Sequence, residues 1–365
     1  MRRLNTLAFL LIIFAGMLWL ALRLYPELPA WQRQLAQAGW HDGTITATFD
    51  KQVAAAVPAD TPVERALNGV LYALTADTGP QVRSGCPGWL FLSEETGYSP
   101  DAERHLSQRL QLTRLLIAEF RQRGIVLLAV PVPDKAEMAA AQLCGMRVAM
   151  QAADRRHTWH QRSASLPLPQ VDLAAGWRQP GYWRTDSHWN RGGATAAASR
   201  VAIVIQSLLP LAPPTPIRLH VNDSAHIRPG DLVHLAGIST NQPPFGPLPD
   251  LDYDIRLDIA RSGGLLDDSA SPYLMLAGSS YSTNTDFLAY LQTALQQEVI
   301  QQSAAGSGFA GSLLTLLQQH PARLQDIRLL IWEWPLRALY QPLTAAETAY
   351  LNAASGAAPL STGAH

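Results

Sequence analysis

Three short apolar runs constrain the fold of this chain most strongly. They cover 125–132, 273–277 and 327–334, and sequence with helical periodicity lies between them. A continuous apolar run of this length is typical of a strand that is covered on both faces, as in a parallel sheet. Such runs in alternation with helices predict an α/β fold with a mainly parallel sheet.

The clearest predicted helix follows Ser99 and Pro100, which suit an N-cap and a first helical turn. Its apolar face recurs at alternating steps of four and three as far as Gly124, where a glycine can end the helix. The residues of this face are Leu106, Leu110, Thr113, Ile117 and Phe120. Further helices are expected over 193–209, 280–297 and 312–319.

The N-terminus has the features of a membrane-directed segment. Arg2 and Arg3 precede an uncharged run at 4–22. As a helix this run would be about 28 Å long, close to the ~30 Å of a bilayer core. The arginines should stay in the cytoplasm, which places the rest of the chain outside the inner membrane. A retained anchor at 1–23 is favoured over a cleaved signal peptide, and both readings export the chain.

The remaining sequence divides into three parts. A lead-in is expected over 24–85, because it is irregular and ends in several glycines. The main domain is expected over 86–345. A C-terminal tail is expected over 346–365, and disorder is expected from Ala353 onward.

Composition excludes one class of function and leaves one covalent bond undecided. Charged residues make up 16% of the chain and the formal net charge is −1, so the basic surface of a nucleic-acid-binding protein is lacking. Cys86 and Cys144 can form one disulfide in an exported chain, and two buried free thiols are the alternative. His157 and His160 have no evident third ligand beside them, so neither a metal nor a cofactor is expected.

Asp186 and His188 lie two residues apart, just before the glycines at 192 and 193. On an extended segment such a pair points to one side with Cα atoms about 7 Å apart, so the carboxylate can reach the nearer ring nitrogen. It would fix the tautomer and stabilise the imidazolium. On a helix the two side chains would diverge by roughly 160°. The alternative is a surface Asp-x-His pair without a function.

Ser280 follows the apolar run at 273–277 in the sequence Gly278-Ser279-Ser280. A serine at a strand-to-helix turn exposes its hydroxyl at the carboxyl edge of a sheet, and nearby backbone N–H groups suit an oxyanion. Ser280 is therefore a candidate nucleophile. The alternative is a serine-rich helix cap that needs no catalysis.

Six short motifs occur in the order found in one known family. They are Gly88-Trp89-Leu90-Phe91-Leu92, Pro131-Val132-Pro133-Asp134-Lys135, Arg184-Thr185-Asp186-Ser187-His188-Trp189-Asn190, Gly230-Asp231-Leu232, Gly278-Ser279-Ser280-Tyr281-Ser282 and Ile331-Trp332-Glu333. With these motifs the chain resembles the SGNH-hydrolase-like domain of the alginate O-acetyltransferases, the AlgJ and AlgX group. It is more similar to the shorter AlgJ-like members, because no carbohydrate-binding module follows the catalytic motifs.

The resemblance implies a three-layer sandwich that works as a periplasmic O-acetyltransferase on an exopolysaccharide. Asp186 would orient His188, His188 would be the general base, and Ser280 would carry the acetyl group. Implied partners are a membrane-bound O-acyltransferase that supplies acetyl groups, the polysaccharide acceptor and the inner membrane. A carbohydrate acetyl-esterase with the same triad, and a non-catalytic polysaccharide-binding component of an export complex, are the alternatives.

Weaker signals suggest four substrate-binding residues, namely Lys135, Trp189, Asn190 and Tyr281. For Lys135 the alternative is a surface or salt-bridged lysine. Trp189 would stack on a sugar or else pack its loop against the core. Asn190 would donate to an oxyanion or else shape the turn. Glu333, at the end of an apolar run, is expected in a buried salt bridge with Arg337.

Overall fold

The computed structural model describes residues 10–11, 13–19, 21–22, 25, 61–175, 177, 180–238, 241–260 and 272–356. Two compact units are distinguished, Met1–Leu67 and Asn68–His365, and the second holds the fold described below. Much of the predicted anchor at 1–23 and of the lead-in at 24–85 lies outside the described residues. The described residues between 10 and 22 are helical. Among all described residues, no helix is both long enough and apolar enough to cross a bilayer.

A four-stranded parallel sheet forms the centre of the second unit. Its strands are, in spatial order, β3 (Val126–Val132), β8 (Leu329–Pro335), β6 (Leu274–Ala277) and β7 (Val299–Gln301). The three apolar runs form β3, β6 and β8, which confirms the predicted α/β fold with a parallel sheet. The sequence does not single out β7, because three residues make too short a run.

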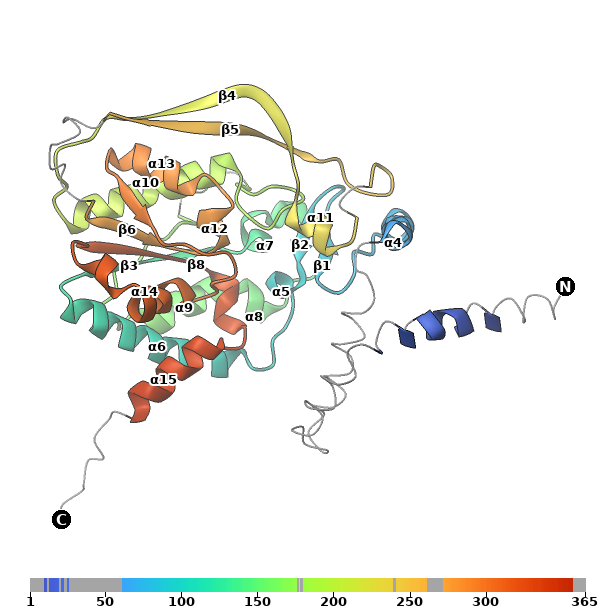
Figure 1. Cartoon of the computed structure of the whole chain (residues 1–365), viewed down its shortest axis with the longest axis horizontal. Coiled ribbons are helices and arrows are strands. Elements are labelled where there is room, and N and C mark those ends of the chain that lie inside the picture. The colour runs from blue at the N-terminus through green and yellow to red at the C-terminus, as the bar shows by residue number, and fades with distance from the viewer. Residues whose placement is uncertain are drawn as a thin grey trace, which may run out of the picture. The chain divides into compact units, whose positions relative to one another are not determined.

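Helices cover both faces of this sheet (Figure 1). On one face lie α10 (Arg191–Leu208) and α13 (Phe287–Leu295), and on the other lie α6 (Ala102–Gln122), α9 (Arg155–Ser163) and α14 (Gly311–Gln319). Successive residues of a strand point to opposite faces. Leu128 and Val130 accordingly join the core beneath α10, whereas Leu127 and Ala129 join the core beneath α6. The result is the expected three-layer sandwich.

The structure also describes further helices and a small antiparallel pair of strands. The helices are α4 (Pro62–Thr75), α5 (Ser93–Thr96), α7 (Lys135–Met138), α8 (Met150–Ala153), α11 (Asp231–Leu235), α12 (Ser280–Thr283) and α15 (Ala345–Gly356), with 3-10 turns at Ala140–Gln142, Pro321–Leu324 and Leu336–Tyr340. The prediction of one helix over 280–297 is wrong, because α12 ends at Thr283 and α13 begins at Phe287. Strands β1 (Val82–Ser84) and β2 (Leu90–Leu92) form a small antiparallel pair.

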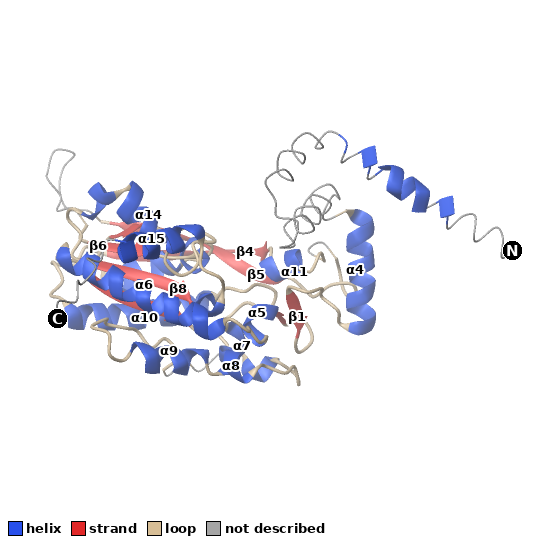
Figure 2. Cartoon of the chain, turned by 90° about the horizontal axis from the view of Figure 1, so that it is seen from below, coloured by secondary structure: helices blue, strands red, loops and turns tan. Residues whose placement is uncertain are grey.

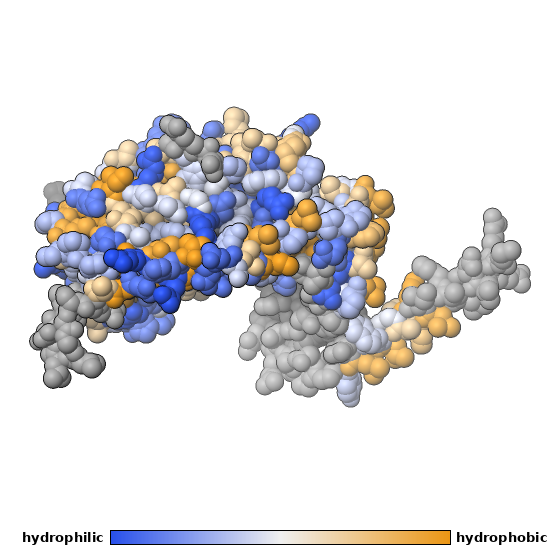
Figure 3. Space-filling view, turned by 90° about the horizontal axis from the view of Figure 1, so that it is seen from above, coloured by the Kyte–Doolittle hydropathy of each residue, from blue (hydrophilic) through white to orange (hydrophobic). Residues whose placement is uncertain are grey.

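A long antiparallel ribbon lies outside the helices α10 and α13. It consists of β4 (Ile217–Arg228) and β5 (Asp250–Ile259), and Figures 1 and 2 show that it runs toward α11. Leu219 and Ile255 attach it to the core. Seen from the ribbon side, hydrophilic and hydrophobic side chains are interspersed (Figure 3). The ribbon strand β4 ends at Arg228, three residues before the start of α11.

The predicted disordered tail begins too early. Its first residues belong to α15, which packs on α6 through a buried ion pair. Nη2 of Arg109 lies 3.3 Å from Oε2 of Glu347, and both side chains are almost completely buried. The Glu347 carboxylate also accepts hydrogen bonds from the N–H groups of Ala310 and Thr344. The prediction of disorder is thus wrong for 353–356, whereas 357–365 lie outside the described residues.

Cys86 and Cys144 form a disulfide, which decides between the two alternatives left by the sequence. It joins the segment between β1 and β2 to the segment after the 3-10 turn at Ala140–Gln142. The bond spans a sequence separation of 58 residues. Closure of so long a loop removes considerable entropy from the unfolded chain.

We therefore expect the double variant Cys86→Ser/Cys144→Ser to lose about 4 kcal/mol of unfolding free energy, which follows from the loop-entropy relation at this separation. Urea denaturation followed by circular dichroism measures the difference. Reduction of the wild-type protein should produce the same shift, which controls for the serine side chains. An unchanged transition midpoint in both experiments would contradict this account of the disulfide.

Candidate active site

The predicted nucleophile lies in a turn at the carboxyl end of β6. β6 ends at Ala277 and α12 begins at Ser280, whose side chain is half-buried. This is the sheet edge at which open α/β folds place their sites. The turn requires Gly278, because a Cβ there would lie 2.4 Å from Ser282 Oγ and 2.6 Å from Glu333 Oε2. The predicted strand-to-helix turn is therefore present.

The carboxylate of Glu333, on the neighbouring strand β8, fixes this turn through hydrogen bonds. It accepts hydrogen bonds from Ser279 N–H (2.8 Å), Ser279 Oγ (2.7 Å) and Ser282 Oγ (2.6 Å). Burial raises the pKa of Glu333, and the hydrogen bonds from the two serines oppose that effect. The carboxylate thus fixes the residues on both sides of Ser280.

The expected salt bridge between Glu333 and Arg337 is wrong. Arg337 instead lies 2.8 Å from Glu94 and 3.3 Å from Glu95, and its Nη1 donates to the hydroxyl of Tyr281 (3.0 Å). The reason is topological, because β8 ends at Pro335 and the following 3-10 turn carries Arg337 toward α5. The serine hydroxyls and the backbone N–H of the turn satisfy Glu333 without a cation.

The predicted pairing of Asp186 and His188 is present. Residues 182 and 189 form an antiparallel bridge, which holds the intervening segment in a tight loop. Asp186 Oδ1 lies 2.6 Å from His188 Nδ1 and accepts the His188 backbone N–H at 2.9 Å. The pair is local and lies in a loop rather than on a helix, as the two-residue spacing requires.

The environment of Asp186 keeps this carboxylate ionised. Burial alone would raise its pKa, but the hydrogen bond from His188 and the charges of His188 and Arg228 lower the pKa to about 2. Because the carboxylate can only accept, Nδ1 of His188 carries the proton of the shared hydrogen bond. In the neutral imidazole, Nε2 is then the basic nitrogen. Among the described residues, no hydrogen bond reaches this buried atom.

A second carboxylate lies beside the histidine. Asp231, the first residue of α11, accepts hydrogen bonds from Ser187 N–H (2.6 Å) and Ser187 Oγ (2.5 Å). Its Oδ2 is 3.6 Å from His188 Nδ1. The ligand atoms of Asp186, His188 and Asp231 lie within 4.8 Å of one another, which would suit a metal ion. Such an ion would have to displace the short hydrogen bond between Asp186 and His188.

Tyr281 connects the serine turn to the dyad loop. Its hydroxyl donates to the carbonyl of Ser187 (2.8 Å), and its ring centroid is 4.9 Å from that of His188. Burial raises the pKa of Tyr281, so the phenol stays protonated. Tyr281 is fully buried and its hydroxyl bonds to Ser187 and Arg337, so the substrate-binding role stays a prediction that these contacts do not require. Ser280 precedes Tyr281, so the turn and the dyad loop adjoin.

The structure does not assign the other predicted substrate ligands to that role. Lys135 is fully buried, and its Nζ donates to the carbonyls of Leu90 (2.6 Å), Arg184 (2.9 Å) and Asp186 (3.0 Å). Burial lowers the pKa of Lys135 to about 8, and nearby carboxylates oppose that effect. It is not a surface lysine, because it fastens the dyad loop to β2, and its substrate-binding role stays a prediction.

Trp189 and Asn190 likewise make their contacts within the protein. Trp189 is fully buried, and its indole N–H donates to Thr285 Oγ1 (2.8 Å), so it presents no exposed face for stacking. Asn190 caps α10 by accepting from Gly193 N–H (3.0 Å), and its amide donates to the Tyr182 carbonyl (3.2 Å). These contacts agree with the alternatives that the sequence left open, in which Trp189 packs its loop against the core and Asn190 shapes the turn.

The Asp186–His188 pair is therefore formed, and Ser280 lies in the adjoining turn. A hydrogen bond between Ser280 and His188 is not among those of the described residues, so that third link stays a prediction. Catalytic hydrogen bonds are often long before substrate binds.

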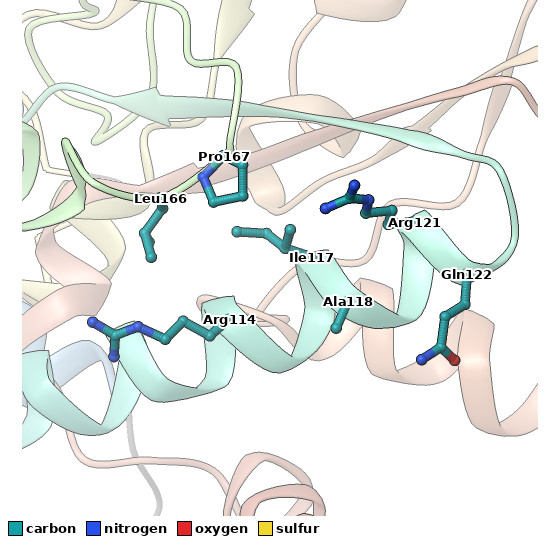
Figure 4. A pocket seen from close by; sticks show the side chains of 7 residues that line it. All are labelled: Arg114, Ile117, Ala118, Arg121, Gln122, Leu166 and Pro167. Carbon is teal, nitrogen blue, oxygen red and sulfur yellow. The ribbon is translucent and has the colours of Figure 1, made fainter.

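A groove on another part of the surface offers no comparable chemistry. It has a volume of about 530 Å³ and runs along the outer side of α6, beside Leu166 and Pro167 (Figure 4). The remaining lining residues are Arg114, Ile117, Ala118, Arg121 and Gln122. None of these is a nucleophile, a carboxylate or a histidine. The turn and the dyad loop are accordingly the better candidate site.

Comparison with known proteins shows which family and fold the chain resembles. A family model described as the SGNH hydrolase-like domain of the acetyltransferase AlgX matches residues 82–336. The chain is 27% identical over 285 residues to the probable alginate O-acetylase AlgJ of Pseudomonas aeruginosa, covering 73% of each chain. It is 29% identical over 276 residues to the protein of that name from Pseudomonas putida, covering 71% of this chain and 70% of that one.

Two solved structures share the fold. The O-acetyltransferase domain of Pseudomonas putida AlgJ superposes with a TM-score of 0.64 at 26% identity, covering 75% of this chain and 98% of that domain. Pseudomonas aeruginosa AlgX superposes with a TM-score of 0.57 at 19% identity, covering 74% of this chain and 65% of that one, a likeness of fold alone.

The tight turn below Ser280 gives a first test of the site. Gly278→Ala should abolish most activity toward a small acetyl ester and lower stability by about 1–3 kcal/mol, because hydrogen bonds hold both neighbouring oxygens in place. Gly311→Ala is the matched control, since its Cβ would meet no atom closer than 3.3 Å. Ester hydrolysis and thermal unfolding measure the two effects. Equal behaviour of the two variants would contradict the close packing of the turn.

Tyr281→Phe tests the positioning role of the tyrosine. The variant keeps the ring beside His188 but loses the hydrogen bonds to Ser187 and Arg337. We expect stability to fall by about 1–2 kcal/mol, as for loss of buried hydrogen bonds, with KM for the ester unchanged. Urea denaturation and steady-state kinetics are the measurements. A large rise in KM without loss of stability would instead place the hydroxyl on the substrate.

Proposed function

Because the chain belongs to the SGNH hydrolase-like AlgX acetyltransferase family, we propose that it is an O-acetyltransferase that acetylates a polysaccharide through an acetyl-Ser280 intermediate. The acceptor we propose is an exopolysaccharide, alginate or one like it, since similar proteins are named probable alginate O-acetylases. A metal or cofactor has no part in this proposal.

One observation carries the proposal most directly. His188 is held through Nδ1 by the ionised Asp186, while its buried Nε2 has no hydrogen-bond partner among the described residues. Because no described protein group engages this nitrogen, its lone pair is available to accept a proton. An oriented imidazole with a free basic nitrogen is what a serine nucleophile needs.

The proposed reaction has two halves. Nε2 of His188 removes the proton of the Ser280 hydroxyl as the serine oxygen attacks the carbonyl carbon of an acetyl donor. The imidazolium then gives this proton to the departing donor group, which leaves acetyl-Ser280. In the second half, Nε2 removes a proton from a sugar hydroxyl, whose oxygen attacks the acetyl carbon. The proton returns to Ser280 as its ester bond breaks.

The developing oxyanion needs fixed donors near Ser280. The backbone N–H of Ser280 is a candidate, because no hydrogen bond of the described turn uses it. A donor fixed in this way stabilises negative charge without having to reorient during the reaction. The rigid contacts of Ser279 and Ser282 with Glu333 would keep that N–H in place.

We also propose that the catalytic domain works in the periplasm and is tethered to the inner membrane by residues 1–23. The disulfide between Cys86 and Cys144 supports an oxidising compartment. The arginines before the apolar run favour export of the rest of the chain. A membrane-bound O-acyltransferase would then be the supplier of acetyl groups, at the same membrane.

A product analysis tests the proposal. The purified chain is given a small acetyl ester with and without an oligosaccharide acceptor, and mass spectrometry follows both the sugar and the protein. We expect acetylated sugar and an acetylated Ser280 peptide, with a loss of at least about 1,000-fold in rate for Ser280→Ala. Ser199→Ala is the control, because this exposed serine bonds only to the Thr195 carbonyl of its own helix, α10.

The same experiment separates the alternatives. Free acetate released at an undiminished rate in the presence of sugar would show an esterase that uses water as acceptor. Absence of any acetylated serine in the wild-type protein, together with sugar binding, would favour a non-catalytic component. Either result would contradict the proposed transfer.

A further inference from the structure

Arg228 contacts both parts of the candidate site, the loop with Asp186 and His188 and the helix α12 that begins at Ser280. Its Nε donates to Asp186 Oδ2 (3.2 Å), and its Nη2 donates to the carbonyl of Asn284 (3.0 Å). The third nitrogen, Nη1, lies 3.4 Å from Asp252 Oδ2 on β5. The guanidinium also lies over the ring of Trp183, with 5.3 Å between them. Only 15% of the side chain is exposed.

The two carboxylate oxygens of Asp186 bond to different partners. Oδ1 of Asp186 accepts both hydrogen bonds from His188, and Oδ2 accepts the one from Arg228. Rotation of the carboxylate would break contacts on at least one side. The carboxylate therefore keeps one orientation toward the imidazole.

The contact with Asn284 reaches the other half of the site. Asn284 is the C-cap residue of α12, the short helix that begins at Ser280. One planar guanidinium thus joins the acid of the dyad to the far end of the helix that carries the candidate nucleophile. Planar geometry with several fixed donors makes arginine suited to such a bridge, and lysine cannot reproduce it.

We propose that Arg228 is a positioning residue. It holds the Asp186–His188 pair in a fixed position relative to α12, the helix that begins at Ser280. This inference rests on the proposed function. It assigns the β4–β5 ribbon a role, because the ribbon delivers the guanidinium to the site. Arg228 touches neither the reacting atoms nor a cofactor, so it acts through Asp186 and α12.

The other charged groups near Asp186 determine how a substitution of Arg228 affects the pKa of this carboxylate. They are His188 in the same loop, Lys135 on α7, Asp231 at the start of α11, and Asp250 and Asp252 on β5. Arg228 and Lys135 are the cations of this group, and only Arg228 bonds to the carboxylate itself. Loss of its charge should therefore raise the pKa of Asp186, which burial already favours.

The test compares Arg228→Met and Arg228→Lys with Arg191→Gln in the full chain. Arg191 is the matched control because it also holds the ribbon, through Tyr253 O (2.8 Å) and Asp252 (3.5 Å), but does not bond to Asp186. The activity readout is kcat and KM for a small acetyl ester across pH. The second readout is the downfield proton resonance of His188 Nδ1–H.

For Arg228→Met we expect kcat to fall roughly 10- to 100-fold with little change in KM, as for loss of one charge-assisted hydrogen bond. The acid limb of the pH profile, which reports protonation of the general base, should move upward, because loss of the cation beside the dyad favours the protonated form of the dyad. Arg228→Lys should restore the acid limb but not the full kcat. The Nδ1–H resonance should weaken or shift in Arg228→Met and stay unchanged in Arg191→Gln.

Three outcomes would overturn the inference. One is an unchanged acid limb and resonance in Arg228→Met, and another is an equal loss in Arg191→Gln. The third is full recovery of kcat in Arg228→Lys. The resonance is independent of turnover, so a wild-type chain that lacks acetyl transfer would refute the proposed function while the positioning role is still decided by the spectrum.

Discussion

The 2.6 Å hydrogen bond between Asp186 Oδ1 and His188 Nδ1 is the contact around which the site is arranged. It forms because the two residues lie two apart in a loop closed by the bridge between 182 and 189. The loop in turn depends on buried charges. Lys135 holds the carbonyls of Arg184 and Asp186, and the Asp250 carboxylate accepts from Thr185 N–H and Oγ1, both at 2.8 Å.

The serine turn depends on the sheet rather than on the loop. β6 lies beside β8, which places Glu333 below Ser279 and Ser282. Tyr281 and Arg228 then connect the turn and α12 to the dyad loop from two sides. Four segments far apart in sequence thus meet at one edge of the sheet. This edge is where parallel α/β folds place ligands and reacting groups.

The sequence predicts those features that depend on neighbours along the chain. The runs that form β3, β6 and β8 are continuous and apolar, and the Asp186–His188 spacing is local, so both are recognisable without the fold. The complete burial of Lys135, Trp189 and Tyr281 depends on contacts with distant segments, so the sequence alone left substrate-binding roles open for them. Arg228 gives no signal in the sequence, because it is 42 residues from Asp186 and its strand is mostly exposed.

The central claim is that the hydroxyl of Ser280 and the imidazole of His188 meet. A crystal structure of the protein, free or with an acyl mimic on the serine, measures this distance directly. The account predicts Ser280 Oγ at about 3 Å from His188 Nε2, within hydrogen-bond reach. A separation beyond about 10 Å, with the turn and the loop both ordered, would exceed that reach several-fold and contradict the account.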